Sequence, residues 1–381
     1  MKEQRCALAV KALSSKSRSI GIIQIANVHL DKAIFMNEQH PYRATIAPVP
    51  QDTPRPLWSV MIPTYNCAGY LRETLASVLS QDPGPDLMQI EVIDDHSTHD
   101  DPASVVEELG RGRVAFYQQP KNLGYIRNFE TCLQRSRGKL IHLLHGDDCV
   151  RDGFYDRLQR GFDENPEIGA AFCRHIFMDM HSHWLYISSL EQPKSGILNN
   201  WLERIAVDQR IQTPSIVVRR DVYERLGGFD RRMSCWGEDW EMWVRIAACY
   251  PVWYEVEPLA LYRRSSTSLS GRSLRTGENM QDFRKAISIA KQYLPSERAD
   301  KLTKTVLKTY AFHSLNYARE FLNAGDTYAA INQIREALRY CFSFNIVYYS
   351  LKLSVRILYL KMMLICMYGL SEQNGIHSLV K

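Results

Sequence analysis

Strand-like and helix-like stretches alternate along the chain from Trp58 to Leu144. The runs that we predict as strands are Trp58–Ile62, Met88–Ile93, Val114–Tyr117 and Leu140–Leu144. Between them, apolar positions at helical spacing predict helices near Tyr70–Leu79, Ala103–Leu109 and Tyr125–Gln134. This order predicts an α/β fold, with a Rossmann-like, mostly parallel sheet flanked by helices on both faces.

The second half of the chain is less regular and becomes wholly helical after about Ser270. Its predicted elements are strands at Ser215–Arg219 and Val252–Val256, a helix at Glu238–Tyr250, and a helical hairpin formed by Leu302–Asn323 and Tyr328–Tyr340. At the other end, residues 1–56 finish in the Pro-rich run APVPQDTPRP, which is typical of a linker. We therefore predict three parts: an N-terminal extension and linker at 1–56, an α/β domain at 57–271, and a helical C-terminal region at 272–381.

The last predicted helix, Ile346–Leu370, is rich in Leu, Ile, Met and Tyr. Three cations, Lys352, Arg356 and Lys361, interrupt it and are expected near one face. This pattern is typical of an interfacial amphipathic helix that contacts a membrane surface, and less so of a span. The alternative interpretation is a helix that packs on its own domain.

Composition narrows the class of protein. A chain of 381 residues that is 45% hydrophobic and 23% charged is an ordinary globular protein, long enough for two domains. The formal net charge of +5 is small for this length, so we expect no nucleic-acid partner. Nine cysteines lie scattered without a CxxC pair, and residues 1–30 lack a secretory signal pattern. We therefore expect a cytoplasmic protein, held at most peripherally on the inner face of the cell membrane.

Polar residues gather where the predicted strands end. The four clusters are PTYN at 63–66, DDHS at 94–97, NLGYIRN at 122–128 and HGDD at 145–148. Parallel strands bring their carboxyl ends to one rim of the sheet, so we expect these clusters to meet there. The adjacent carboxylates Asp147 and Asp148 repel each other, and such pairs usually hold a divalent cation or share a proton. The alternative is a solvated turn that caps the helix predicted at Phe154–Phe162.

The order of these clusters resembles that of the family 2 glycosyltransferases, enzymes of the GT-A fold that use nucleotide-diphosphate sugars. The resemblance covers Trp58 to about Ser270, and WSVMIPTYNCAGYLRETLASVLSQ is its most specific block. Further blocks in the same order are TPSIVVRRDVYERLGGFD at 213–230, GEDWEMWVRI at 237–246 and LYRRSSTSLS at 261–270. The resemblance implies that the α/β domain at 57–271 is a GT-A glycosyltransferase domain.

The resemblance also implies which residues bind the sugar donor. The residues expected on the nucleobase and the neighbouring turn are Pro63, Thr64, Tyr65, Asn66 and Asp95. Asp95 would accept a hydrogen bond from an imide N–H of uracil or thymine, unless one of the two acids at 94–95 only caps the next helix. Asn122 and Gly124 would shape the following loop, and Arg127 would pair with the diphosphate or support the metal-binding acids. An isolated arginine is otherwise a surface ion-pair partner.

HGDD stands where the family places its DxD motif. Asp147 matches the second acid of that motif, which implies that it ligates Mn²⁺ or Mg²⁺ directly. Two positions depart from the family pattern: His145 replaces the first acid, and Ser265 stands where many relatives have a histidine. His145 would lie near the ribose or diphosphate, and as a ligand it would favour Mn²⁺ over Mg²⁺.

Glu238 and Asp239 align with the family's ED pair at the start of a helix. Asp239 matches the general base that takes a proton from the acceptor hydroxyl, and Glu238 is the substitute candidate. On the acceptor side we expect Trp236, as a stacking face for a sugar, and Thr213. The alternative is that both acids are helix-start residues without a chemical role.

These interpretations predict an inverting, metal-dependent glycosyltransferase that moves a sugar from a UDP- or dTDP-type donor to a glycan or lipid-linked glycan, in cell-surface polysaccharide synthesis. The alternative is a catalytically inactive nucleotide-sugar-binding or scaffold protein of the same fold, which His145 and Ser265 keep open. A nicotinamide-dependent oxidoreductase is disfavoured, because the first strand leads into PTYNCAG and not GxGxxG.

Overall fold

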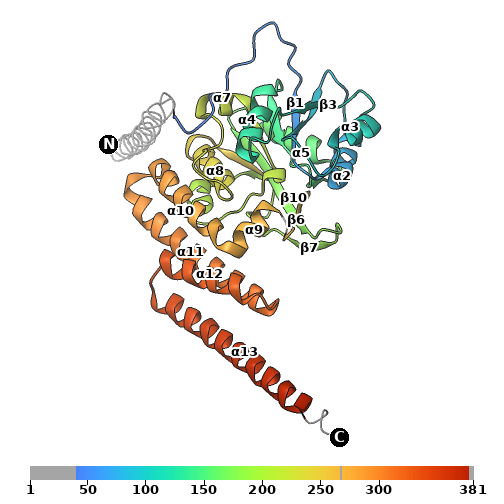
Figure 1. The fold of residues 1–381 in the computed structure, drawn as a ribbon. Helices are drawn as coiled ribbons and strands as arrows, with labels where there is room; N and C mark the ends of the chain where they lie inside the picture. Colours follow the sequence, from blue (N-terminus) through green and yellow to red (C-terminus); the bar gives the residue numbers. More distant parts are fainter. Residues whose placement is uncertain (1–39, 267, 377–381) are drawn as a thin grey trace, which may run out of the picture.

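The structure, a computed structural model, describes residues 40–266 and 268–376. An α/β region built on one large sheet is followed by a helical region, and a long terminal helix projects away from both (Figure 1). The strand order is β3-β2-β1-β4-β9-β6-β10-β5, with β7 paired to β6 and β8 paired to β10. The expected fold class is confirmed, although the sheet is mixed beyond β4.

The first half of the sheet is parallel. Its strands are β1 (Trp58–Thr64), β2 (Met88–Asp94), β3 (Ala115–Gln118) and β4 (Leu140–Leu143), joined by helices α2 (Ala68–Leu79), α3 (Pro102–Gly110) and α4 (Tyr125–Arg135). Every residue of β1 is buried, and its successive side chains point to opposite faces of the sheet. Val60 and Ile62 pack under α2, α3 and α5 (Phe154–Glu164), whereas Met61 packs with α4 on the other face.

The second half of the sheet contains strands of both directions. They are β5 (Cys149–Val150), β6 (Ala170–Met178), β7 (Trp184–Ile187), β8 (Gly196–Ile197), β9 (Ile216–Arg219) and β10 (Val252–Arg263). Strand β9 runs antiparallel between β4 and β6, so β6 and its parallel partner β10 end at the same rim as β1 and β4. Helices α6 (Trp201–Ile205), α7 (Arg220–Leu226) and α8 (Glu238–Cys249) and the 3-10 turn η1 (Thr213–Ser215) complete this half.

Strand β10 is longer than the pattern predicted. The prediction stopped at Val256, but the strand resumes beyond an irregularity at Pro258 and continues to Arg263. Proline lacks the N–H needed for regular pairing, so a register shift here lets the strand continue past it. Because of this continuation, the last residues of β10 reach the rim that carries the polar clusters.

The helical region contributes to the same hydrophobic core as α8. Its elements are α9 (Leu269–Thr276), α10 (Glu278–Ala290), η2 (Lys291–Tyr293), α11 (Ser296–Asn323), α12 (Thr327–Tyr340) and α13 (Phe344–Ile376). Trp240 of α8 packs against Phe283 of α10, and Phe283 stacks on Tyr310 of α11 with ring centroids 3.6 Å apart. The proposed boundary at residue 271 therefore divides the chain where the packing is continuous.

Residues 40–56 lie before the sheet, and part of this segment packs into the fold. Ala44 and Ile46 are buried, and the Arg43 guanidinium pairs with Asp230 and Glu241. The linker interpretation therefore omits this packing, while the rest of the extension, residues 1–39, lies outside the described residues.

Helix α13 covers the stretch predicted at 346–370. Ile346 and Ile357 are buried where α13 contacts α11 and α12, whereas the opposite face is open to solvent. None of the helices in the described part of the chain is both long enough and apolar enough to cross a membrane.

Candidate active site

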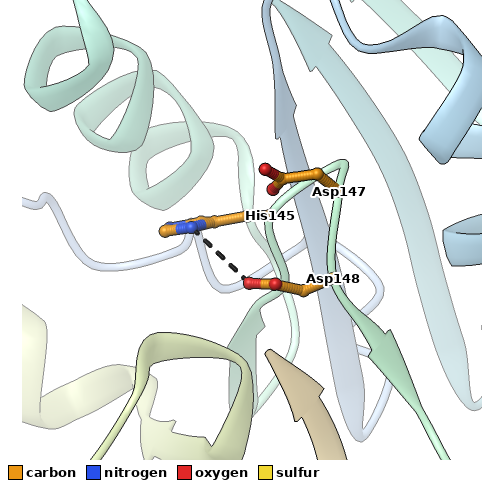
Figure 2. A group of neighbouring side chains, drawn as sticks. All are labelled: His145, Asp147 and Asp148. Carbon is orange, nitrogen blue, oxygen red and sulfur yellow. Dashed lines mark ion pairs between the residues drawn. The ribbon is translucent and has the colours of Figure 1, made fainter. Parts of the chain in front are cut away.

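Three potential metal ligands meet in the turn after β4. His145, Asp147 and Asp148 each offer a ligand atom, and these atoms lie within 4.8 Å of one another. Figure 2 shows the three side chains on the same side of the turn, with His145 facing Asp148. The Nδ1 atom of His145 is 3.8 Å from Oδ2 of Asp148.

A glycine lets this turn nest against the end of β1. The Gly146 amide donates to the Pro63 carbonyl at 3.0 Å. A Cβ atom on residue 146 would lie 2.5 Å from Cγ2 of Thr64, closer than real Cβ contacts allow. Any larger residue would push HGDD away from PTYN, so Gly146 sets the distance between the two clusters.

The cluster contains buried polar atoms whose hydrogen-bonding capacity is unused. Oδ1 of Asp148 accepts from the Arg263 amide at 2.8 Å, but Oδ2 of Asp148 and Nε2 of His145 are buried without a hydrogen-bond partner. Burial, and then the charge of Asp147, raises the pKa of Asp148 well above its usual range, while burial lowers the pKa of His145. These unused atoms, next to the half-buried Asp147, fit a divalent cation that accepts oxygen and imidazole ligands.

The buried side chain of Arg263 holds the HGDD turn in place. The Arg263 side chain is 1% exposed; its Nε donates to the Asp147 carbonyl at 2.8 Å and its Nη2 pairs with Glu73 at 2.9 Å. Its guanidinium also lies over the Tyr70 ring. Arg263 belongs to the matching block at 261–270, but its role could not be predicted from the sequence, because only the extension of β10 brings it against the HGDD turn.

The donor-binding candidates that follow β2 and β3 are joined by hydrogen bonds. Both oxygens of Asp95 accept backbone N–H groups, from Leu123 at 2.8 Å and Gly124 at 2.9 Å, and Nδ2 of Asn122 donates to the Asp95 carbonyl. Burial raises the pKa of Asp95 despite these bonds. Gly124 has a φ of 85°, a conformation that favours glycine. Asp95 therefore holds the NLG loop against the end of β2.

The PTYN turn is latched to the DDHS turn in a similar way. Oδ1 of Asn66 accepts from the amides of Thr98 and His99, and the Asn66 amide donates to Ser97. Thr64 is buried, with its hydroxyl beside Asp94, whereas Tyr65 is 47% exposed. Arg127 is exposed on the first turn of α4. The rim thus brings together all four predicted clusters and leaves Tyr65 and Arg127 available to a ligand.

The second acid pair opens helix α8. Tyr125 donates to Glu238 at 3.1 Å, and Gln209 donates to Asp239 at 2.7 Å. Burial and the charge of Asp239 raise the pKa of Glu238 to about 8, while burial raises the pKa of Asp239 to about 6. A carboxyl with a pKa near 6 can accept a proton near neutral pH, as a general base must.

One series of aromatic contacts and one shared tyrosine link the acid pair to the HGDD turn. Tyr125 packs edge-on against Phe129, and Phe129 stacks on His145 with ring centroids 5.0 Å apart. Burial raises the pKa of the Tyr262 hydroxyl, and the charges of Asp148, Asp147 and Asp239 raise it further. Tyr262 therefore lies within electrostatic reach of both acid groups.

The acceptor-side candidates lie in two different segments. Trp236 is partly buried against the core just before α8, and Thr213 is buried at the start of η1. Ser265 follows β10 and contacts Met180 at the turn after β6. Sequence reasoning missed Tyr125, Gln209 and Tyr262 as site residues, because each is placed by contacts between distant segments, and only Tyr125 and Tyr262 stood within quoted motifs.

Comparisons with known proteins agree with this geometry. Residues 59–227 match the family model described as glycosyl transferase family 2. An uncharacterized protein of Mycobacterium tuberculosis is 28% identical over 61% of this chain and 75% of its own length. An uncharacterized glycosyltransferase of Mycoplasma pneumoniae is 29% identical over 31% of this chain and 40% of its own length. The O-antigen biosynthesis protein RfbC of Myxococcus xanthus is 24% identical over 51% of this chain, but over 16% of its own length.

Solved structures share the fold. TarS of S. aureus superposes with a TM-score of 0.53 at 16% identity, covering 78% of this chain and 53% of TarS. A TarS fragment, 1–349, in complex with UDP-GlcNAc has the same TM-score at 13% identity, covering 74% of this chain and 91% of the fragment. At these identities the likeness concerns the fold alone. The family model that matches residues 59–227, the relatives named as glycosyltransferases and the shared fold together support a family 2 glycosyltransferase.

Proposed function

We propose that the chain transfers a sugar from a UDP- or dTDP-type donor to a hydroxyl of a glycan or lipid-linked glycan, with inversion at the anomeric carbon. The proposal rests mainly on the contacts that join the two acid groups: Glu238 bonds to Tyr125, and Phe129 packs between Tyr125 and His145. The relative named for O-antigen biosynthesis and the fold neighbour solved with UDP-GlcNAc support this choice of donor and acceptor classes.

The chain's own residues suggest how the donor is held. The exposed Tyr65 side chain would lie against the nucleobase, and the NLG loop, held by Asp95, would bring Arg127 near the diphosphate. Each oxygen of the Asp95 carboxylate already accepts one loop amide, so a base N–H would have to use a remaining lone pair. Asp95 therefore contributes first to the shape of the donor site.

Asp147 and His145 would hold a Mn²⁺ or Mg²⁺ ion, with Asp148 beside them. Such an ion, when bound, neutralises negative charge that develops on the departing nucleoside diphosphate. The imidazole of His145 favours Mn²⁺ among these two ions. Arg263 keeps the HGDD turn in place through the Asp147 carbonyl and the Asp148 carboxylate.

Asp239 would act on the acceptor. Its carboxylate takes the proton of the acceptor hydroxyl as that oxygen forms a bond to the anomeric carbon. The bond from the anomeric carbon to the diphosphate oxygen breaks on the opposite face, and its electron pair leaves with the nucleoside diphosphate. One displacement inverts the configuration and needs no covalent intermediate. Trp236 and Thr213 would line the acceptor side of this reaction.

A donor screen tests this function. We expect UDP- or dTDP-sugars, with Mn²⁺, to raise the melting temperature of the protein and to undergo slow hydrolysis, whereas Mn²⁺ alone does not have this effect. Stabilisation without any hydrolysis or transfer would favour the second candidate, an inactive nucleotide-sugar-binding protein, for which His145 and Ser265 are the motivating departures. If no nucleotide sugar either stabilised the protein or was turned over, both candidate functions would be contradicted.

The terminal helix would place the enzyme on the cytoplasmic surface of a membrane. On α13 the exposed residues Phe344, Tyr348, Leu351, Val355, Leu358 and Met362 recur every three or four positions and so form one stripe. Lys352 and Arg356 flank this stripe on one side and Lys361 on the other, instead of gathering on one face. Residues 344–362 contain no acid, so the surface is complementary to anionic lipid.

We expect the double variant Leu351→Ser with Leu358→Ser to lose binding to anionic vesicles by more than tenfold, since each buried methylene contributes about 0.8 kcal/mol. Flotation with vesicles of phosphatidylcholine and phosphatidylserine measures this. Leu87→Ser, at an exposed leucine before β2, is the matched control and should bind as the parent does. Two results would contradict a lipid surface as the partner of this stripe. One is unchanged vesicle binding in the double variant, and the other is a change in the molecular mass of the protein in solution instead of a loss of vesicle binding.

A further inference from the structure

The Asp239 carboxylate is held between its own helix and a separate loop. Oδ1 of Asp239 accepts from the Trp240 amide at 2.6 Å, and Oδ2 accepts from Nε2 of Gln209 at 2.7 Å. Gln209 belongs to the loop at 206–212, between α6 and η1. Each carboxylate oxygen therefore has one donor, and one of the two comes from outside α8.

The loop at 206–212 is braced on several sides. Nε1 of Trp240 donates to the Ile205 carbonyl at 2.8 Å, and Arg210 pairs with Glu191 at 3.1 Å. On the side of the helical region, Nε2 of His313 lies 3.0 Å from Oδ1 of Asp208. Helix α11 thereby reaches the residue next to Gln209, so the helical region takes part in placing this loop.

The side-chain amide of Gln209 is only half satisfied in this position. Its Oε1 atom is buried without a hydrogen-bond partner, whereas its Nε2 atom is directed at the carboxylate. Burying an unsatisfied carbonyl is unfavourable, so a loop optimised for stability alone would satisfy both ends of the amide. The arrangement instead retains the end that donates to Asp239.

We propose that Gln209 is a positioning residue, which orients the Asp239 carboxylate toward the acceptor hydroxyl and keeps it in its proton-accepting form. The proposal rests on the proposed function in so far as Asp239 is the base. It adds that the loop at 206–212, braced by His313 of α11, makes the helical region part of the catalytic apparatus.

Several titratable groups face Asp239, and they frame the test. Glu238 is its neighbour on α8, Tyr262 approaches from β10 and Tyr310 from α11, with the Asp208–His313 pair on the adjoining loop. Burial raises the pKa of both tyrosines, so they stay neutral while the acids titrate. Gln209 is therefore the neutral donor whose removal should move the titration of Asp239.

The experiment compares Gln209→Leu with the parent, using carboxyl ¹³C NMR to follow the titration of Asp239, assigned with Asp239→Asn. We expect the titration midpoint to rise by about one pH unit, because a carboxylate that loses a donor binds its proton more tightly. In donor hydrolysis, the midpoint of the acidic limb of the pH profile should move to higher pH by the same amount, while KM for the donor stays unchanged. Gln209→Asn, which keeps the amide but shortens its reach, should give the same direction if Gln209→Leu fails to fold.

The control is Gln212→Leu, in the same loop, whose backbone carbonyl accepts from Ser215. It should leave the Asp239 titration in place. An unmoved titration in both Gln209 variants would overturn the proposal, whatever the activity. A moved titration in a protein that hydrolyses no donor would keep the positioning role and contradict the proposed function alone, since the NMR readout needs no turnover.

Discussion

Replacing Asp239 with asparagine is expected to lower kcat by about 100- to 10,000-fold, the usual contribution of a general base. Asparagine keeps the size of the side chain and its bond to the Trp240 amide, but it cannot take the acceptor proton. Donor affinity should stay within about twofold, because the donor is held at the HGDD rim. Steady-state transfer kinetics and donor titration measure the two quantities separately.

The pH profile gives this prediction a second signature. The pKa of Asp239 is raised by burial to about 6, so parent activity should fall tenfold per pH unit below that value, and the Asn variant should lack this limb. The free energy of unfolding changes with pH in the opposite direction to activity. A raised folded-state pKa means that ionisation destabilises the protein as the pH rises from about 3.8 toward 6, so Asp239→Asn should melt no lower than the parent at neutral pH.

Asp221→Asn is the matched control, an isosteric change at an exposed acid of α7. It should leave kcat and the acidic limb unchanged. An Asp239→Asn protein that folds and retains the kcat of the parent would show that the base lies elsewhere, with Glu238 the next residue to test.

Replacing Asp147 with asparagine is expected to lower transfer by more than about 100-fold, because a bound cation contributes several kcal/mol of charge stabilisation. An amide oxygen is a weaker ligand than a carboxylate and leaves the diphosphate charge unbalanced. Unlike Asp239→Asn, this variant should also lose Mn²⁺-dependent donor binding. Isothermal titration with Mn²⁺ and UDP measures that loss without turnover.

Asp152→Asn, an exposed acid five residues along the chain, is the control and should bind Mn²⁺ and UDP as the parent does. Asp147→Asn with unchanged Mn²⁺-dependent binding would place the cation on other ligands. Because Asp148 is buried and bonded to Arg263, Asp148→Asn would then separate a metal role from a structural one by its melting temperature.

Local pattern predicted the elements that bring the first acid group to the rim. The run at Leu140–Leu144 could be read as a strand because its neighbours in sequence are polar, and parallel pairing then placed HGDD beside PTYN. The helix at Glu238 was equally clear from its apolar stripe. By contrast, β6 and β7 were missed, because β6 mixes apolar residues with Arg174 and His175, and β7 is exposed along its length.

The contacts that tune the acids could not be predicted in the same way. Gln209 lies 30 residues from Asp239, and Tyr125 lies 113 residues from Glu238, so only the tertiary fold brings them together. The position of Arg263 depends on the irregularity at Pro258, because β10 continues beyond it, and an alternating pattern of apolar and polar residues does not predict such an irregularity. The burial of Asp148 could not be predicted either. Asp147 and Asp148 are equivalent in the sequence, but only Asp148 is fully buried in the fold.

The most direct test of the central claim is a crystal structure with Mn²⁺ and UDP, in which the anomalous signal locates the cation. We expect a peak beside the Asp147 carboxylate, with the terminal phosphate of UDP pointing toward Asp239. A peak at other residues, or a nucleotide whose terminal phosphate is turned away from Asp239, would contradict the claim that the two acids serve one reaction centre.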